Sequence, residues 1–285
     1  AGACARVDER GARLAAFFRE VPMDSISIAV HGATGRMGQA VLRAAVECDD
    51  VRIAAALVRA DSPAIGQAAV GCASQPLAFS AALGPNVPDV LIDFSLPAAF
   101  DEALALACDR GMAFVSGTTG LGEVRMAALE TAARTIPVLW SANFSLGVAV
   151  LAHCVAEAAS RLPGWDCEIV EAHHRHKKDA PSGTALALGR VVAEARGVAF
   201  DAVARRAREG ADAPRRAGEI GFAALRGGDI VGEHMVVFAG DGERIELAHR
   251  ATDRAIFARG ALVAARWLAR RAPGRYTMAD VVAGN

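Results

Sequence analysis

Short apolar runs alternate with amphipathic segments through the first half of the chain. The apolar runs have the length expected of buried parallel strands, and they cover residues 26–31, 51–58, 89–95, 113–116 and 136–141. The segments between them carry apolar residues at helical spacing, most clearly over 39–46, 98–110 and 121–134. Strands that alternate with helices predict an α/β fold with a doubly wound, Rossmann-type parallel sheet.

The pattern changes beyond residue 144. A long helix is expected over about 146–162, and a strand is expected over 165–171. Short strands punctuated by glycines follow, which is typical of antiparallel hairpins. These strands cover 219–226, 229–239 and 243–250. They predict a second α+β domain built on an open mixed or antiparallel sheet, and a helix over 255–272 is expected to pack back on the first domain.

The length of 285 residues suggests two domains. We predict a dinucleotide-binding domain over 23–144 together with 255–285, and a substrate-binding and oligomerisation domain over 145–254. Residues 1–22 are rich in Ala and Arg and lack the apolar stretch of a secretory signal. We expect them to be an N-terminal extension, either helical or disordered, with Met23 as the natural start.

Composition narrows the class of protein. Lys and Arg number 31 and Asp and Glu number 32, so no global charge favours nucleic acid or an anionic membrane. No apolar run reaches the length of a membrane span. The six cysteines show no paired spacing, and we expect them to be reduced, small core residues of a cytoplasmic protein.

A glycine-rich turn follows the first predicted strand, and a predicted helix follows the turn. It reads Gly32-Ala33-Thr34-Gly35-Arg36-Met37-Gly38. Glycines in this context allow a tight turn and close approach of the backbone to a dinucleotide pyrophosphate. The spacing Gly-x-x-Gly-x-x-Gly differs from the usual Gly-x-Gly-x-x-Gly, so an ordinary strand–helix turn stays an alternative.

Other small, polar loops follow later strands. They are Asp93–Ser95, Gly117–Thr119 and Ser141–Phe144. Because the carboxyl ends of parallel strands share one edge, these loops and the glycine-rich turn should meet there and bind one ligand. The second strand ends at Val58 and Arg59, without the carboxylate that suits an NAD ribose; Arg59 therefore favours NADP, unless it is a solvated loop charge.

A dense cationic loop runs from His173 to Lys178 and is followed by a predicted helix. Ser182 has the position of an N-cap, so the backbone N–H groups of Gly183 and Thr184 should point out of the helix N-terminus. Cations beside a helix N-terminus predict a pocket for a small dicarboxylate. A solvated basic loop is the alternative.

The segment Glu171-Ala-His-His-Arg-His-Lys-Lys-Asp-Ala-Pro-Ser-Gly-Thr184 closely resembles the signature of the 4-hydroxy-tetrahydrodipicolinate reductase (dihydrodipicolinate reductase) family of lysine and diaminopimelate biosynthesis. The glycine-rich turn, Gly117-Thr-Thr-Gly, Ala142-Asn-Phe-Ser and Gly232-Glu-His resemble other motifs of that family. Two positions depart from the family pattern. Many members carry an acidic residue where Val58 stands, and a basic residue is often found at the position of Leu96.

The resemblance implies reduction of a cyclic imine dicarboxylate by NADPH or NADH, with loss of water. It implies His173 as the general acid/base and Lys177 as the proton donor. Substrate carboxylates would be bound by His174, Lys177, Gly183 and Thr184. The dinucleotide would be bound by Gly32, Ala33, Thr34, Gly35, Arg36, Met37, Gly117, Thr118, Thr119, Ser141, Ala142, Asn143 and Phe144. The family also implies a homotetramer assembled through the sheet of the second domain.

Other functions compete with this interpretation. His173, His174 and His176 could ligate zinc, but no cysteine or acidic ligand stands at the usual spacing, so no metal is expected. A non-catalytic sensor of dinucleotides would not need the proton donors of the loop. Another Rossmann oxidoreductase of the aspartate pathway would also need a basic loop for its anionic substrate, but it would not carry the full signature.

Overall fold

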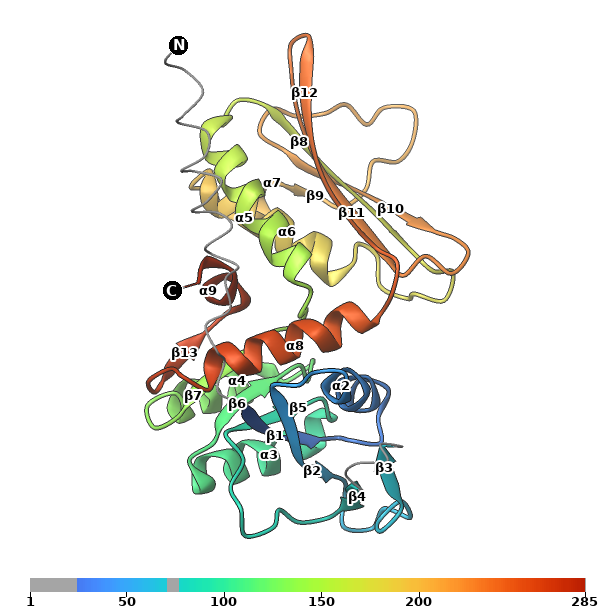
Figure 1. The fold of residues 1–285 in the computed structure, drawn as a ribbon. Coiled ribbons are helices and arrows are strands. Elements are labelled where there is room, and N and C mark those ends of the chain that lie inside the picture. The colour runs from blue at the N-terminus through green and yellow to red at the C-terminus, as the bar shows by residue number, and fades with distance from the viewer. Residues whose placement is uncertain (1–24, 71–76, 285) are drawn as a thin grey trace, which may run out of the picture.

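The computed structural model describes residues 25–70 and 77–284. The extension expected at 1–22, Met23, Cys4 and Cys72 lie outside the described residues. The two sheets lie at opposite ends of the molecule, and helix α8 (Ala255–Leu268) crosses between them (Figure 1). The predicted fold class is confirmed: a mostly parallel α/β sheet is followed by a second, mixed sheet.

In the described residues the first sheet has eight strands in the order β13-β7-β6-β5-β1-β2-β4-β3. Their bounds are β1 Ile26–His31, β2 Val51–Leu57, β3 Ala68–Val70, β4 Leu77–Ser80, β5 Val90–Asp93, β6 Ala113–Ser116, β7 Pro137–Trp140 and β13 Gly274–Tyr276. All neighbours pair in parallel except β3 and β4. The sequence pattern predicts β1, β2, β5, β6 and β7 but does not reveal the short strands β3, β4 and β13.

Helices cover both faces of this sheet, because its strands are apolar on both sides. One face packs on α2 (Arg36–Val46) and α8, and the core there includes Ile28, Val30 and Leu262. The other face packs on α3 (Pro97–Arg110) and α4 (Gly122–Ala132), with Phe100 and Phe114 edge to face. This arrangement leaves the carboxyl ends of β1, β5, β6 and β7 at one common edge.

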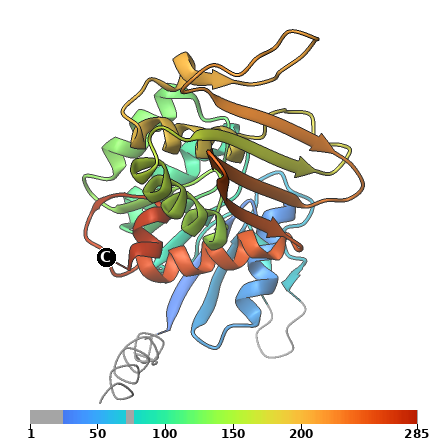
Figure 2. The ribbon, with the colours of Figure 1, turned by 90° about the horizontal axis from the view of Figure 1, so that it is seen from above.

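The second sheet has five strands within the described residues, in the order β12-β11-β8-β10-β9. Their bounds are β8 Asp166–His173, β9 Ala204–Arg205, β10 Ile220–Arg226, β11 Gly232–Gly240 and β12 Glu243–Ala251. Helices α5 (Leu146–Arg161) and α6 (Gly183–Ala195) pack on one face, and the short α7 (Phe200–Val203) packs on α6. No helix of the described part covers the opposite face (Figure 2).

The hairpin prediction is correct for β11 and β12 but wrong for β10 and β11. Strand β8 lies between β10 and β11, pairing with the first in parallel and with the second antiparallel. Glycines 227 and 228 mark where the chain turns, but a turn does not specify the strand with which the returning chain pairs. Strand β8 is therefore the central strand of the sheet, and the alternation of buried and more exposed residues along it shows that one of its faces is covered.

The end of the chain returns to the first sheet. Helix α8 contacts α2, β5, β6 and β7, and β13 adds a strand beside β7. A Cβ on Gly260 of α8 would overlap the carbonyl of Phe144, so this glycine lets the helix approach the loop after β7. Helix α9 (Met278–Ala283) then packs against α5 and α8.

Two further expectations concern single residues and helices. The expected burial of the cysteines is correct for Cys167, but Cys48 and Cys108 are half-buried and Cys154 on α5 is exposed. Helical spacing predicts burial of one face, and Cys154 stands just outside that face. None of the helices in the described part of the chain has the length and apolar character that a membrane span requires.

Candidate active site

A cavity of about 1090 Å³ lies where the two domains meet. Loops at the carboxyl edge of the first sheet contribute Thr119, Ser141, Ala142 and Asn143. The second domain contributes His173, Lys177, Ser182, Gly183 and Thr184. Residues from both sets of predicted site loops therefore line one space, although they lie far apart in the sequence.

The glycine-rich turn stands at the same sheet edge. Gly32 has a left-handed φ of 73°, and a Cβ there would lie 2.8 Å from the carbonyl oxygen of Phe94. A Cβ on Gly38 would overlap the carbonyl oxygen of Gly32. The N-cap residue Gly35 offers no side-chain hydrogen bond to the start of α2, so the first N–H groups of that helix are available to an anion. These features fit a dinucleotide pyrophosphate.

Asp93, at the end of β5, fixes the loops of this edge. Its carboxyl group is fully buried, lies 3.0 Å from His31 Nδ1, and accepts hydrogen bonds from Ser116 Oγ at 2.9 Å and Thr118 Oγ1 at 2.7 Å. Burial alone would raise the pKa of Asp93, but hydrogen bonds from His31, Ser95 and Thr118 together hold it below its usual value. Asp93 is therefore a charged anchor between three loop ends.

Three of the predicted cofactor residues at this edge have buried side chains. The Thr118 hydroxyl is buried against Asp93, and its carbonyl accepts a hydrogen bond from Trp140 Nε1 at 2.8 Å. The Phe144 ring is buried and packs edge to face on Phe94, with 5.5 Å between ring centroids. Ala33 is also fully buried. Sequence spacing identifies such loops but does not show which side chains turn inward.

Asn143 joins the two domains across the cavity. Its Nδ2 donates to Thr184 Oγ1 at 3.1 Å, and its Oδ1 accepts from the N–H of Ser145 at 2.8 Å. Ser145 is the N-cap of α5. The loop predicted to hold the dinucleotide thus bonds directly to the start of α6, where the substrate carboxylates are predicted to bind.

The start of α6 has the predicted capping. Ser182 is the N-cap, and its Oγ accepts a hydrogen bond from the N–H of Ala185 at 3.2 Å. Gly183 is exposed to the cavity, and a Cβ on it would meet no atom within 4 Å. An anion can therefore approach the N–H groups of Gly183 and Thr184 without obstruction.

The cationic loop brings only some of its side chains to the cavity. His173 and Lys177 line it, and Lys177 Nζ lies 2.9 Å from Asp179 Oδ1. His174 does not line the cavity; its ring lies near His176, with 6.3 Å between centroids. Outside the cavity, Arg59 has a side chain that is 76% exposed and a loose ion pair with Asp61 at 3.5 Å.

Two histidines lie beneath the N-cap serines of the helices that face the cavity. Ser182 Oγ is 3.0 Å from His234 Nε2, and Ser145 Oγ is 3.3 Å from His249 Nε2. Burial is the main cause that lowers the pKa of His234, to about 4, and it also lowers the pKa of His249. The Gly-Glu-His motif contains His234, but its spacing does not reveal that the residue supports Ser182.

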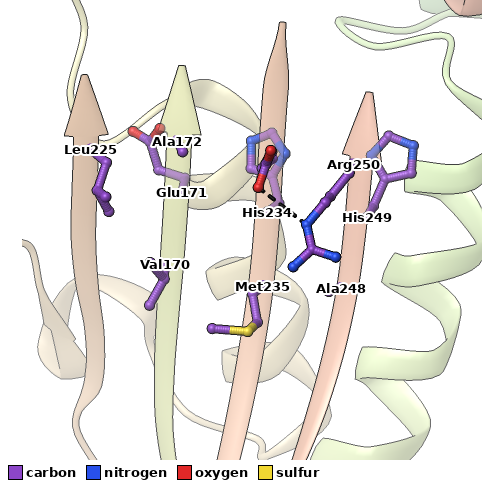
Figure 3. A pocket seen from close by; sticks show the side chains of 10 residues that line it. Val170, Glu171, Ala172, Leu225, His234, Met235, Ala248, His249 and Arg250 are labelled. Atoms are coloured by element: carbon purple, nitrogen blue, oxygen red, sulfur yellow. Dashed lines mark hydrogen bonds and ion pairs between the residues drawn. The ribbon is translucent and has the colours of Figure 1, made fainter. Parts of the chain in front are cut away.

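A buried carboxylate, Glu171, stands beside His173. Figure 3 shows it on β8, between Leu225 of β10 and His234 of β11. Its side chain is 1% exposed, and Arg226 binds both of its oxygens at 2.7 Å. In the sequence, Glu171 stands out only as part of a motif, and no pattern indicates a role for Arg226. Among the described residues, no group of three or more His, Cys, Asp or Glu side chains is arranged to hold a metal ion.

Comparison with known families extends this picture. The family model described as "Dihydrodipicolinate reductase, N-terminus" matches residues 26–144, and the model described as "Dihydrodipicolinate reductase, C-terminus" matches residues 147–282. The chain belongs to the dihydrodipicolinate reductase family. The family expected from the sequence motifs is therefore confirmed.

Individual dihydrodipicolinate reductases agree with the family match. A 4-hydroxy-tetrahydrodipicolinate reductase of Stenotrophomonas maltophilia (strain K279a) is 51% identical over 259 residues, which cover 90% of this chain and 98% of the relative. One from Parvibaculum lavamentivorans is 48% identical over 264 residues, 90% of this chain and 97% of the relative. A dipicolinate-bound dihydrodipicolinate reductase from Paenisporosarcina sp. TG-14 has the same fold, with a TM-score of 0.70, 22% identity, and coverage of 89% of this chain and 97% of that one.

Proposed function

We propose that this protein is a 4-hydroxy-tetrahydrodipicolinate reductase. It reduces its cyclic substrate to tetrahydrodipicolinate with a nicotinamide cofactor, and water is lost from the 4-hydroxyl position. The family match over both halves of the chain carries this conclusion. The cavity lies between the loops at the carboxyl edge of the first sheet and the cationic loop, so cofactor and substrate could meet in it.

The two carboxylates of the substrate would bind on the second domain. The N–H groups of Gly183 and Thr184 and the ammonium of Lys177 offer charge and hydrogen bonds on one wall of the cavity. His174 would add a contact when its loop closes over the substrate. The relative from Paenisporosarcina is described as bound to dipicolinate, an aromatic ring with the same pair of carboxylates, which supports this class of ligand.

The first domain would bind the dinucleotide. Gly32 to Met37 would hold the pyrophosphate, while Gly117 to Thr119 and Ser141 to Phe144 would hold the nicotinamide half, in part through backbone groups. When bound, NADPH or NADH supplies the hydride. Arg59 is exposed and held only loosely by Asp61, so its guanidinium is free to bind a 2′-phosphate, which favours NADPH.

Residues of the second domain would carry out the proton transfers. Hydride addition leaves negative charge on the conjugated ring, so a proton must be delivered from a group in the cavity. Lys177 lines the cavity, and its ion-pair partner Asp179 is on the same loop. Lys177 would donate the proton, and His173 would act as the general acid/base that assists the loss of water.

We also propose a division of roles between the two domains and a mode of assembly. Residues 23–144 with 255–285 would bind the cofactor, and 145–254 would bind the substrate and form the oligomer. The face of the second sheet opposite α5 and α6 carries Leu225, which is 54% exposed, beside a hollow lined by Val170, Met235 and Ala248 (Figure 3). That face would join subunits of a cytoplasmic homotetramer, and light scattering on the purified protein tests its mass.

Oxidation of NADPH tests the function. Freshly prepared 4-hydroxy-tetrahydrodipicolinate should start NADPH oxidation, and NADH at the same concentration should be oxidised more slowly. Aspartate semialdehyde with phosphate and NADP⁺ serves as the comparison, because another oxidoreductase of the aspartate pathway would oxidise the semialdehyde and form NADPH. Activity with the semialdehyde alone would reject the proposal.

A further inference from the structure

The carboxylate of Glu171 is fully engaged by hydrogen bonds. Oε2 lies 2.6 Å from His173 Nδ1 and accepts from Arg226 Nη1 at 2.7 Å. Oε1 accepts from the N–H of Ser182 at 3.0 Å and from Arg226 Nη2 at 2.7 Å. One buried group thus contacts the ends of β8 and β10 and the start of α6.

This carboxylate stays charged. Burial alone would raise the pKa of Glu171, but hydrogen bonds from Arg226, His173 and Ser182 together hold it below its usual value. Because Arg226 binds both oxygens, the carboxylate is neutralised without being protonated. Glu171 is therefore not a proton carrier, and its effect on the site has to be exerted through the groups that it binds.

The contact with Glu171 selects one tautomer of the His173 ring. Residues 171 and 173 are two apart on β8, so their side chains project from the same face. A carboxylate accepts hydrogen bonds and does not donate them, so Nδ1 of His173 carries the proton. Nε2 is left free and faces Gly232, since a Cβ built on Gly232 would lie only 3.1 Å from this nitrogen. The His173 ring lines the cavity.

Glu171 also fixes the position of the anion site at the start of α6. Ser182 is the N-cap of α6, and its N–H bonds to Glu171. Arg226 Nη2 additionally donates to the carbonyl of Asp179 at 2.6 Å, within the loop that carries Lys177. The positions of His173, the cationic loop and the helix start therefore depend on one ion pair.

We propose that Glu171, clamped by Arg226, is a positioning residue of the reductase: it holds the proton of the His173 ring on Nδ1, presents Nε2 to the substrate, and fixes the start of α6. This inference rests on the role of His173 in the proposed function. The arrangement corresponds to the carboxylate–imidazole pairs that orient a catalytic histidine in other enzymes. The titratable and charged groups near His173 are Glu171 on its own strand, Arg226 on β10, His234 on β11, and His174 and Lys177 on the loop.

The first test is kinetic and uses Glu171→Gln. Turnover should fall by about 10²-fold or more, because the amide of the introduced glutamine can no longer hold the His173 ring in the tautomer that has its proton on Nδ1. NADPH affinity should be unchanged. The limb of the pH profile that disappears in His173→Gln should move to lower pH in Glu171→Gln, since a nearby negative charge has been lost. Glu171→Asp should restore part of the turnover.

Glu157→Gln is the control. It removes a carboxylate paired with Arg161 on the exposed face of α5 and should leave both turnover and the pH profile unchanged.

The second test needs no variant at Glu171. In protein labelled with ¹⁵N-histidine, the His173 ring of the wild type should carry its proton on Nδ1, with a strongly downfield proton resonance that is absent in His173→Gln. A proton on Nε2 with Nδ1 bare would overturn the proposal, even if Glu171→Gln fails to fold.

The outcomes also separate this inference from the proposed function. If His173→Gln keeps full turnover, the catalytic role of His173 is wrong, and the positioning role of Glu171 falls with it. If His173→Gln loses turnover while Glu171→Gln keeps it with an unshifted pH profile, the role of His173 stands and only the role of Glu171 is rejected.

Discussion

Acid should destabilise this protein through His234. The side chain is buried beneath Ser182, and burial is the first cause that lowers its pKa to about 4, from an ordinary 6.5. In the unfolded chain the imidazole recovers its ordinary value. Between these two values the unfolded state binds the proton more readily than the folded state, so stability falls as the pH falls.

The size of the effect follows from the two pKa values. The full stability that depends on neutral His234 is present above about pH 6.5 and is lost below about pH 4. Across that window the loss amounts to about 3 kcal/mol, at about 1.4 kcal/mol for each tenfold change in proton affinity. Between about pH 7 and about pH 5 the expected loss from this residue is about 2 kcal/mol.

Urea unfolding measured by circular dichroism at both pH values provides the assay. Glu171, Asp93 and His249 also have shifted pKa values, so the wild type alone does not isolate His234. The variant His234→Gln keeps a polar group that can bond to Ser182 and does not titrate. The wild type should lose about 2 kcal/mol more than this variant on acidification.

Equal losses in the two proteins would mean that His234 is protonated in the folded state at about the same pH as in the unfolded chain. The unpartnered Nδ1 of His234 would in that case have to find an acceptor on protonation, which it does not have among the described residues.

Further substitutions test other parts of the site. Lys177→Ala should lower turnover by about 10²–10⁴-fold with a modest rise in the substrate KM. Lys177→Arg should restore part of the binding but not turnover, because a guanidinium is a poor acid. Wild-type turnover in Lys177→Arg would pass the proton-donor role to His173. Arg59→Ala should raise the KM for NADPH and spare that for NADH, and equal changes would remove Arg59 as the phosphate contact. Gly38→Ala should cost about 1–3 kcal/mol of stability in a thermal shift assay, because its Cβ would overlap the Gly32 carbonyl, and an unchanged Tm would contradict that overlap.

Local patterns explain which parts of this fold could be predicted. Buried parallel strands such as β1 and β6 are short apolar runs, and the cap at Ser182 is a property of a few adjacent residues. Gly111 closes α3 in a left-handed conformation, as a glycine after a helical pattern predicts. For the same reason, the glycine-rich turn and the cationic loop can be recognised from the sequence alone.

Features that depend on distant segments could not be predicted in this way. Arg226 meets Glu171 only because β10 pairs in parallel with β8, and the turn glycines had indicated a hairpin with β11 instead. The inward turn of Thr118 depends on Asp93, which lies 25 residues away. Sequence spacing could identify chemically capable residues, but the direction of each side chain is decided by tertiary packing.

The reaction should add a nicotinamide hydride to the ring of 4-hydroxy-tetrahydrodipicolinate. Mass spectrometry of the product formed with NADPH dideuterated at the nicotinamide C4 follows that hydride. The product should be tetrahydrodipicolinate that has gained one deuterium and lost the 4-hydroxyl group. Oxidation of NADPH without deuterium in the product, or a product that keeps the hydroxyl group, would show that this protein does not catalyse the proposed reduction.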